Sequence, residues 1–210
     1  MKLFKVLCLT MCLFIAGMVN AFADSLTAIN YSIGSNSYKL KDADITLEYG
    51  FSPFGLNVSN FWYGGDGAFH VGFDLSYGFW ISTTQTYEDN TVDDWFNIGE
   101  YLSAGLGFLI DMGSSNSFKL TPGVQLNIDE AFWTGSGNQT MTDFYVAFSI
   151  DFAYQHYFSD WIGLNLGFDM DFPLAGGATT KTTYNGKTYS DSDDIGGGFD
   201  YRFYAGIVLR

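Results

Sequence analysis

Several residue types are scarce in this chain, and each shortage excludes a class of protein. Of 210 residues only two are cysteine, and 15% are charged, well below the quarter or so that is usual in soluble domains. Lys and Arg number 9 against 23 Asp and Glu, and they form no cluster, so the chain lacks the basic patch that nucleic-acid binding requires. Aromatic residues reach 19%, with 25 glycines and three prolines. This combination is unusual for a soluble domain.

The first 23 residues have the organisation of a secretory signal peptide. Lys2 and Lys5 form a short basic region, residues 6–16 are apolar, and Ala21–Ala23 has the small-x-small pattern of a cleavage site. The apolar run is too short for a convincing membrane-spanning helix. We expect cleavage after residue 23, so that residues 24–210 form one mature domain.

Both cysteines, Cys8 and Cys12, lie in the segment that we expect to be removed. The mature chain would then have no disulfide, no thiolate metal site and no cysteine nucleophile. Loss of Lys2 and Lys5 also leaves 7 basic against 23 acidic residues, a net charge of −16.

Alternation with a period of two is the main signal in the mature chain. In residues 69–82 the odd positions are aromatic or aliphatic, as in Phe69 and Phe73, and the even positions except Trp80 are small or polar, as in Gly72 and Asp74. The pattern returns in residues 96–110, 118–128, 144–154, 162–172 and 199–209. Such alternation predicts β-strands with one apolar and one polar face.

The chemistry of the two faces indicates which of them points inward. The polar face consists mostly of Gly, Ser, Asn and Asp, which suit the narrow interior of a barrel of about eight strands. The other face is bulky, aromatic and almost uncharged, as expected of a surface in contact with lipid. Short turns at residues 64–67, 113–117 and 159–160 alternate with longer connections at 83–94, 130–141 and 175–194. We therefore predict a closed antiparallel up-and-down β-barrel that spans a membrane.

The N-terminal part of the domain allows two assignments of the first strands. Residues 25–33 read as strand one, and residues 43–63 as a long second strand that is kinked at Pro53, where the apolar face changes parity. A β-bulge produces such a change. This assignment gives eight strands. A break at Pro53 would give nine, and the choice between 25–33 and 43–52 as the first strand stays open.

At this level the sequence resembles the small bacterial outer-membrane β-barrels of the OmpA transmembrane domain, OmpX and opacity-protein type. The resemblance covers the mature chain and rests on the alternation, the glycine-rich inward face and the aromatic strand at 199–209. It implies an outer-membrane location, contact with the lipid bilayer, and delivery by periplasmic chaperones to the outer-membrane assembly machinery. One departure is that such chains usually end on an aromatic residue, whereas this sequence ends Leu209-Arg210.

The inward face carries a group of charged residues that forms the candidate site. These are Asp74, Asp129, Asp151, Asp169, Asp171, Asp200 and Arg202. The favoured interpretation is an ion-paired and hydrated network that fills the lumen, since buried carboxylates must be paired, protonated or hydrated. A Ca²⁺ site built from clustered carboxylates is the second interpretation, and a carboxylate dyad that activates water is the third. No metal or cofactor is expected under the favoured interpretation.

Tryptophans and histidines complete the set of candidate residues. Four tryptophans fall at or near strand ends, where aromatic girdles meet the membrane interfaces: Trp62, Trp95, Trp133 and Trp161. His70 has inward parity beside a short turn, and His156 has lipid-side parity. Neither position suits a general base, so we expect no catalytic residue and no enzyme activity.

We therefore expect a structural or surface-interaction role, in which residues 83–94, 130–141 and 175–194 are the segments able to contact an extracellular ligand. A small cation-preferring pore or Ca²⁺-binding barrel that uses the acidic lumen is the alternative. A lipid-modifying or proteolytic barrel enzyme is a further alternative.

Overall fold

The computed structural model describes residues 25–42, 45–64, 67–83, 85–87, 90–92, 95–133, 138–184 and 187–210. The predicted signal peptide, residues 1–23, lies outside the described residues. No helix in the described part of the chain is long and apolar enough to span a membrane.

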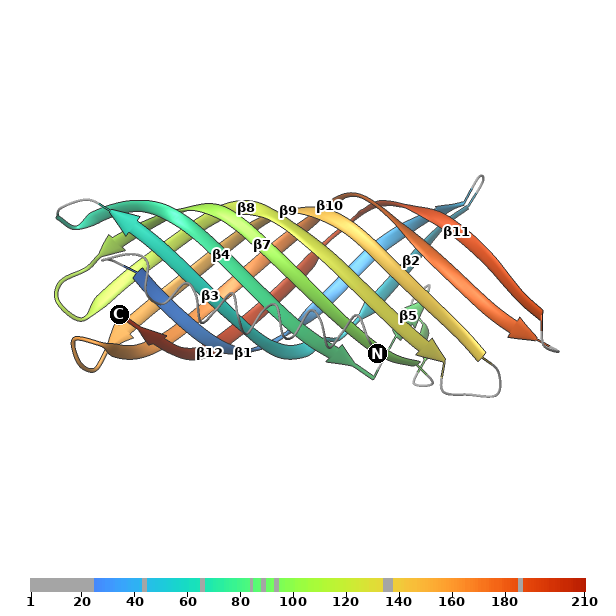
Figure 1. Cartoon of the computed structure of the whole chain (residues 1–210), viewed down its shortest axis with the longest axis horizontal. Helices are drawn as coiled ribbons and strands as arrows, with labels where there is room; N and C mark the ends of the chain where they lie inside the picture. The colour runs from blue at the N-terminus through green and yellow to red at the C-terminus, as the bar shows by residue number, and fades with distance from the viewer. Residues whose placement is uncertain are drawn as a thin grey trace.

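A ring of eight strands, each antiparallel to its neighbours, closes the molecule into a tilted barrel (Figure 1). In ring order the strands are β1 (Ser25–Asp42), β3 (Phe54–Gly64), β4 (Phe69–Ser82), β7 (Trp95–Asp111), β8 (Asn116–Trp133), β9 (Asn138–Tyr157), β10 (Ile162–Tyr184) and β12 (Asp200–Leu209). Pairing of β12 with β1 closes the ring. The predicted closed barrel of about eight strands is confirmed.

The remaining strands lengthen the barrel at one end or pair with the edge of another strand there. β2 (Ile45–Phe51) pairs with the second half of β1, and β11 (Lys187–Gly198) pairs with β1 and β10. Two short strands, β5 (Gln85–Tyr87) and β6 (Asn90–Val92), add to the edge of β2. β2 and β3 thus form one interrupted strand, as do β11 and β12, which explains why the sequence allowed two strand counts.

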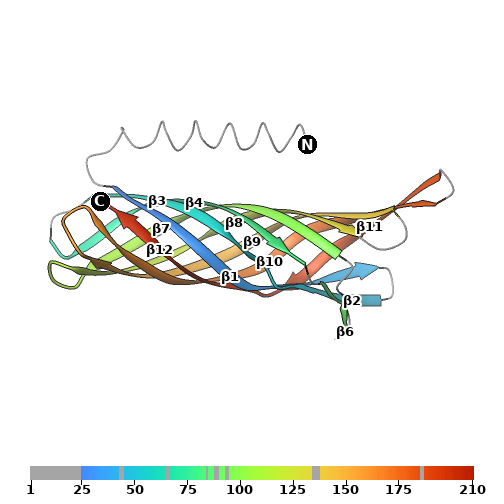
Figure 2. The same cartoon turned by 90° about the horizontal axis from the view of Figure 1, so that it is seen from below.

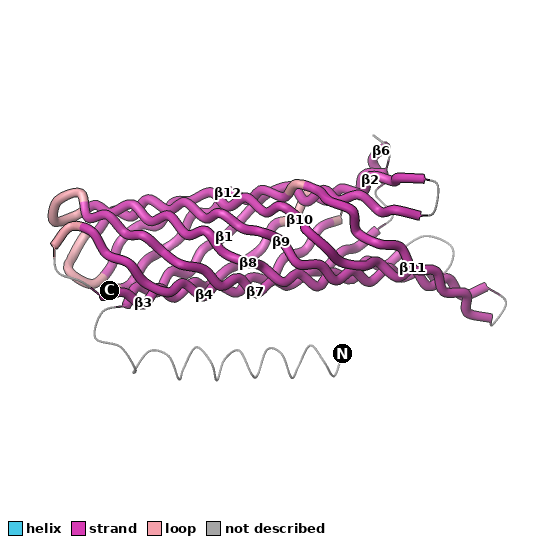
Figure 3. The backbone as a smooth tube through the Cα atoms, turned by 90° about the horizontal axis from the view of Figure 1, so that it is seen from above, coloured by secondary structure: helices cyan, strands magenta, loops and turns pink. Residues whose placement is uncertain are grey.

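The two ends of the barrel differ. Short turns between β3 and β4, β7 and β8, and β9 and β10 lie at one end, together with the start of β1 and the end of β12 (Figure 1). We call this the short-turn end. At the opposite end the β10–β11 hairpin projects beyond the other strands, as Figure 2 shows from below, and Figure 3 shows that almost all of the described chain is strand.

Two segments expected to be irregular are strands. Residues 34–42 continue β1, although their mix of Gly, Ser and Asn hides the alternation. Most of residues 175–194, expected to be a loop, form the β10–β11 hairpin, with cross-strand contacts such as Thr183 Oγ1 to Thr188 Oγ1 at 3.1 Å. The prediction of loops here was wrong because it relied on an apolar face, whereas β-branched residues favour strands without one.

Strand irregularities line up on adjacent members of the ring. Pro53 separates β2 from β3, and its carbonyl accepts the Gly34 N–H at 3.0 Å. The register of β1 with β11 shifts between Tyr38 and Leu40, and that of β10 with β9 shifts between Pro173 and Ala175. Phe199, between β11 and β12, donates its N–H to the Ser37 carbonyl at 2.8 Å. These breaks form a bulge line across one side of the barrel.

The faces follow the predicted parity. Outward apolar side chains are exposed, as in Leu56 at 59%, Leu106 at 53% and Phe203 at 53%, whereas inward polar side chains such as Asn30 and Gln125 are buried. A protein that exposed this much apolar area to water would be insoluble, whereas the same surface is suited to contact with the hydrocarbon of a membrane.

Candidate functional site

Lys119 organises one half of the polar interior. Its ammonium forms an ion pair with Asp74 of β4 and lies 3.4 Å from Asp151 of β9. The side chains of Lys119 and Asp74 are each 4% exposed. Asp74 also accepts the Ser76 hydroxyl at 2.9 Å. The sequence prediction missed Lys119, although it shares the inward parity of Thr121 and extending the polar row by two residues would have found it.

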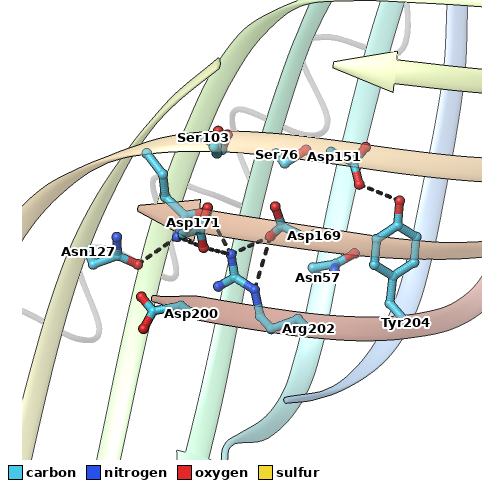
Figure 4. A network of polar contacts seen from close by, with 12 residues as sticks. Asn57, Ser76, Ser103, Asn127, Asp151, Asp169, Asp171, Asp200, Arg202 and Tyr204 are labelled. Carbon is cyan, nitrogen blue, oxygen red and sulfur yellow. Dashed lines mark hydrogen bonds and ion pairs between the residues drawn. The ribbon is translucent and has the colours of Figure 1, made fainter. Parts of the chain in front are cut away.

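Arg202 organises the other half (Figure 4). Its Nε donates to Asp169 at 3.0 Å, and its Nη2 pairs with both Asp169 and Asp171 of β10. The same Nη2 donates to Gln125 Oε1 of β8 at 2.8 Å. The guanidinium lies over the Tyr101 ring of β7, 3.9 Å from its centroid. One buried cation therefore ties together four strands.

Glycines on the inward face make room for the tyrosines of these two networks. A Cβ on Gly78 would meet the Tyr101 ring at 2.1 Å, and a Cβ on Gly167 would meet the Tyr204 ring at 2.0 Å. Tyr204 thereby lies flat across β10 and donates its hydroxyl to Asp151 at 2.5 Å. The inward glycines thus leave the space that the rings of Tyr101 and Tyr204 occupy.

A third group of carboxylates lies toward the end of the barrel opposite the short turns, which we call the long-strand end. Asp200 accepts the Ser37 N–H at 2.8 Å and the Tyr145 hydroxyl at 2.9 Å. Asp129 pairs across the strands with Asp143, which accepts the Tyr38 hydroxyl. Neither oxygen of Asp129 has a hydrogen-bond partner among the described residues. Asp143 was missed by the prediction, although it shares the parity of Asp151.

Apolar clusters close the interior on both sides of these networks. The cluster nearer the short-turn end contains Leu26, Ala28, Phe61, Leu109, Tyr157 and Val208. The cluster nearer the other end contains Tyr38, Leu40, Trp80, Tyr101, Ala131, Met141, Tyr145, Ala147, Ala178 and Ile195. A polar cavity of about 30 Å³, lined by residues that include Asn57, Asp151 and Asp169, has room for about two water molecules. Within the described residues, the polar networks and the two apolar clusters together occupy much of the barrel interior.

All seven charged residues predicted for the lumen lie in this interior. Arg202 joins Asp169 and Asp171, Lys119 joins Asp74 and Asp151, and Asp129 and Asp200 stand in the third group. Within the described residues, no group of three or more His, Cys, Asp or Glu side chains is arranged to hold a metal ion.

The predicted tryptophans occupy different surroundings. Trp62 stacks on Phe73 with ring centroids 6.1 Å apart, and Trp161 is 62% exposed in the β9–β10 turn. Trp133 pairs with Trp95 at the long-strand end and shares the inward parity of Ala131. The side chain of Trp95 lies outside the described part of the structure.

The two histidines are held by polar neighbours. His70 is buried with Nε2 3.2 Å from Asp111 Oδ2. His156 lies on the outer face with Nδ1 2.9 Å from Asn116 Oδ1. Each thus has a structural partner of its own.

No family model and no curated protein matches the chain, but solved structures do. OprG from Pseudomonas aeruginosa is 8% identical with a TM-score of 0.59, over 90% of this chain and 95% of that one. A major outer membrane protein from Thermus thermophilus is 12% identical with a TM-score of 0.54, over 87% and 98%. The protease OmpT from Escherichia coli is 8% identical with a TM-score of 0.52, over 89% and 96%.

The chain has the fold of a small outer-membrane β-barrel. The predicted resemblance is confirmed at the level of the fold. At 8–12% identity the likeness does not extend to the role of any one neighbour.

Proposed function

We propose that this protein is an outer-membrane barrel with a closed lumen, which anchors extended strands at the cell surface for a structural or surface-interaction role. The observation that carries the proposal is the set of buried ties across the lumen. Lys119 connects β4, β8 and β9, and Arg202 connects β7, β8, β10 and β12. Opening a path for ions would require these charges to separate in a confined interior, which is costly.

The outer face supports the location. The apolar outward rows run along all the ring strands, and closure leaves no unpaired backbone edge toward lipid. In the usual orientation of such barrels the short turns face the periplasm and the longer strands project outside. The signal peptide, the periplasmic chaperones and the assembly machinery are parts of this proposal.

The β10–β11 hairpin supports the surface role. Its tip is exposed on both strands, as in Tyr184 at 68% and Tyr189 at 60%. The strand β11 also carries Asp191, Asp193 and Asp194. A rigid, acidic and aromatic projection is suited to contact with a ligand outside the cell, and we propose no catalytic role.

The test combines conductance with surface trimming. Refolded protein in a planar bilayer is expected to give no sustained current, and cells that carry it are expected to lose an epitope tag placed at residues 185–186 when protease is added outside. A steady cation-selective current that falls in Asp169→Asn would favour the pore instead. Protection of the tag in intact cells would reverse the proposed orientation.

A further inference from the structure

We propose that Arg210 is a latch that fastens the mouth at the short-turn end after the ring has closed, and that it sets the rate at which the barrel unfolds. Arg210 follows β12 directly. Its Nη2 donates to Asp111 Oδ1 at 3.1 Å, its backbone N–H donates to the Trp161 carbonyl at 3.1 Å, and its guanidinium lies over the Tyr157 ring at 4.0 Å.

The latch spans the mouth from side to side. Asp111 ends β7, and β7 is four strands from β12 in either direction around the ring of eight. The two strands therefore face each other across the barrel. The other carboxylate oxygen of Asp111 lies 3.2 Å from His70 Nε2 of β4. His70, Asp111, Arg210 and Tyr157 thus join four strands that do not all pair with one another.

The order of events follows from this geometry. Arg210 and Asp111 are 99 residues apart in the sequence, and they meet only once β12 has paired with both β1 and β10. Contacts that form after the transition state of folding slow unfolding and leave the folding rate unchanged. The latch therefore acts on the lifetime of the closed barrel.

The strength of the latch comes from its two parts together. The Arg210 and Asp111 side chains are 29% and 27% exposed, and an ion pair of this exposure contributes little alone. Stacking of the guanidinium on Tyr157 adds a cation–π interaction and fixes the orientation of the guanidinium toward Asp111. Loss of the pair is therefore expected to raise the unfolding rate about fivefold.

The experiment measures folding and unfolding rates of the full mature barrel in lipid vesicles, from the mobility of unboiled samples on a gel. Arg210→Ala is expected to unfold about fivefold faster and to fold at the wild-type rate. Asp111→Asn, which leaves the Tyr157 stacking in place, is also expected to unfold faster, and the double variant is expected to unfold more slowly than the two single effects multiplied together. Lys187→Ala, in the exposed hairpin, is the matched control and is expected to unfold at the wild-type rate.

Two results would overturn the proposal. If Arg210→Ala unfolds as slowly as the control, the contact does not slow unfolding of the barrel. Arg210→Ala that folds more slowly and unfolds at the wild-type rate would show that the contact forms before closure. Arg210→Gln, which keeps most of the side-chain volume, is expected to match Arg210→Ala and guards against a packing effect.

Discussion

Replacing Lys119 with methionine tests whether the buried ties hold the barrel together. Methionine keeps the length and volume of the side chain, so the change removes the charge from a site that is 4% exposed. Asp74 then keeps the hydrogen bond from the Ser76 hydroxyl, and Asp151 keeps the one from the Tyr204 hydroxyl. Breaking a buried ion pair from one side costs about 3–5 kcal/mol, because the remaining charge is left buried.

The assay is equilibrium unfolding in urea of the barrel in vesicles, followed by tryptophan fluorescence and by gel mobility. Lys119→Met is expected to lower the free energy of unfolding by about 3–5 kcal/mol, and addition of Asp74→Asn is expected to restore part of it. Lys187→Met, on the exposed hairpin, is the control and should change stability by less than about 0.5 kcal/mol. If Lys119→Met and the control are equally stable, the ion pair does not hold the interior and the proposed closed lumen loses its basis.

Three further predictions address the contact of Gly167 with Tyr204, the lipid-facing side chains and the β10–β11 hairpin. Gly167→Val should destabilise by about 1–3 kcal/mol through its clash with the Tyr204 ring, and Tyr204→Leu in the same chain should recover part of this in the same urea titration. Leu106→Arg, on the outward face, should cost about 2–4 kcal/mol in vesicles, a loss that detergent-refolded protein would show less. Trimming residues 180–193 to a short turn should leave heat-modifiable mobility intact, and loss of folding would show that the hairpin belongs to the barrel core.

The alternation of the chain was enough to predict which side chains point inward. Because a strand has only two faces, strict alternation predicts that Asp169, Asp171 and Arg202 point into the lumen. It also predicts that Leu106 and Phe203 point outward. Lys119 and Asp143 obey the same parity but lie just before the inward-facing rows at residues 121–129 and 145–155 from which the candidate site was predicted. The polar interior of the predicted strands could therefore be assigned from the sequence.

The choice of partners could not be predicted in the same way. Which carboxylates of β10 and which amide of β8 Arg202 meets depends on strand stagger around the closed ring, and stagger is set by many weak pairings that no single residue reveals. The upper half of β1 was hidden for another reason. In residues 34–42 the apolar side chains are the inward ones, since Tyr38 and Leu40 are buried and Lys39 between them is exposed. No outward apolar row therefore marks this half of β1.

The bulge line has a structural consequence. Breaks at Pro53, between Tyr38 and Leu40, at Phe199 and between Pro173 and Ala175 fall on strands that are neighbours in the ring. A β-bulge bends the strand that carries it and increases its local twist. Four neighbouring strands interrupted at one level are therefore expected to change direction together, so that the projecting β10–β11 hairpin need not follow the tilt of the ring strands below it.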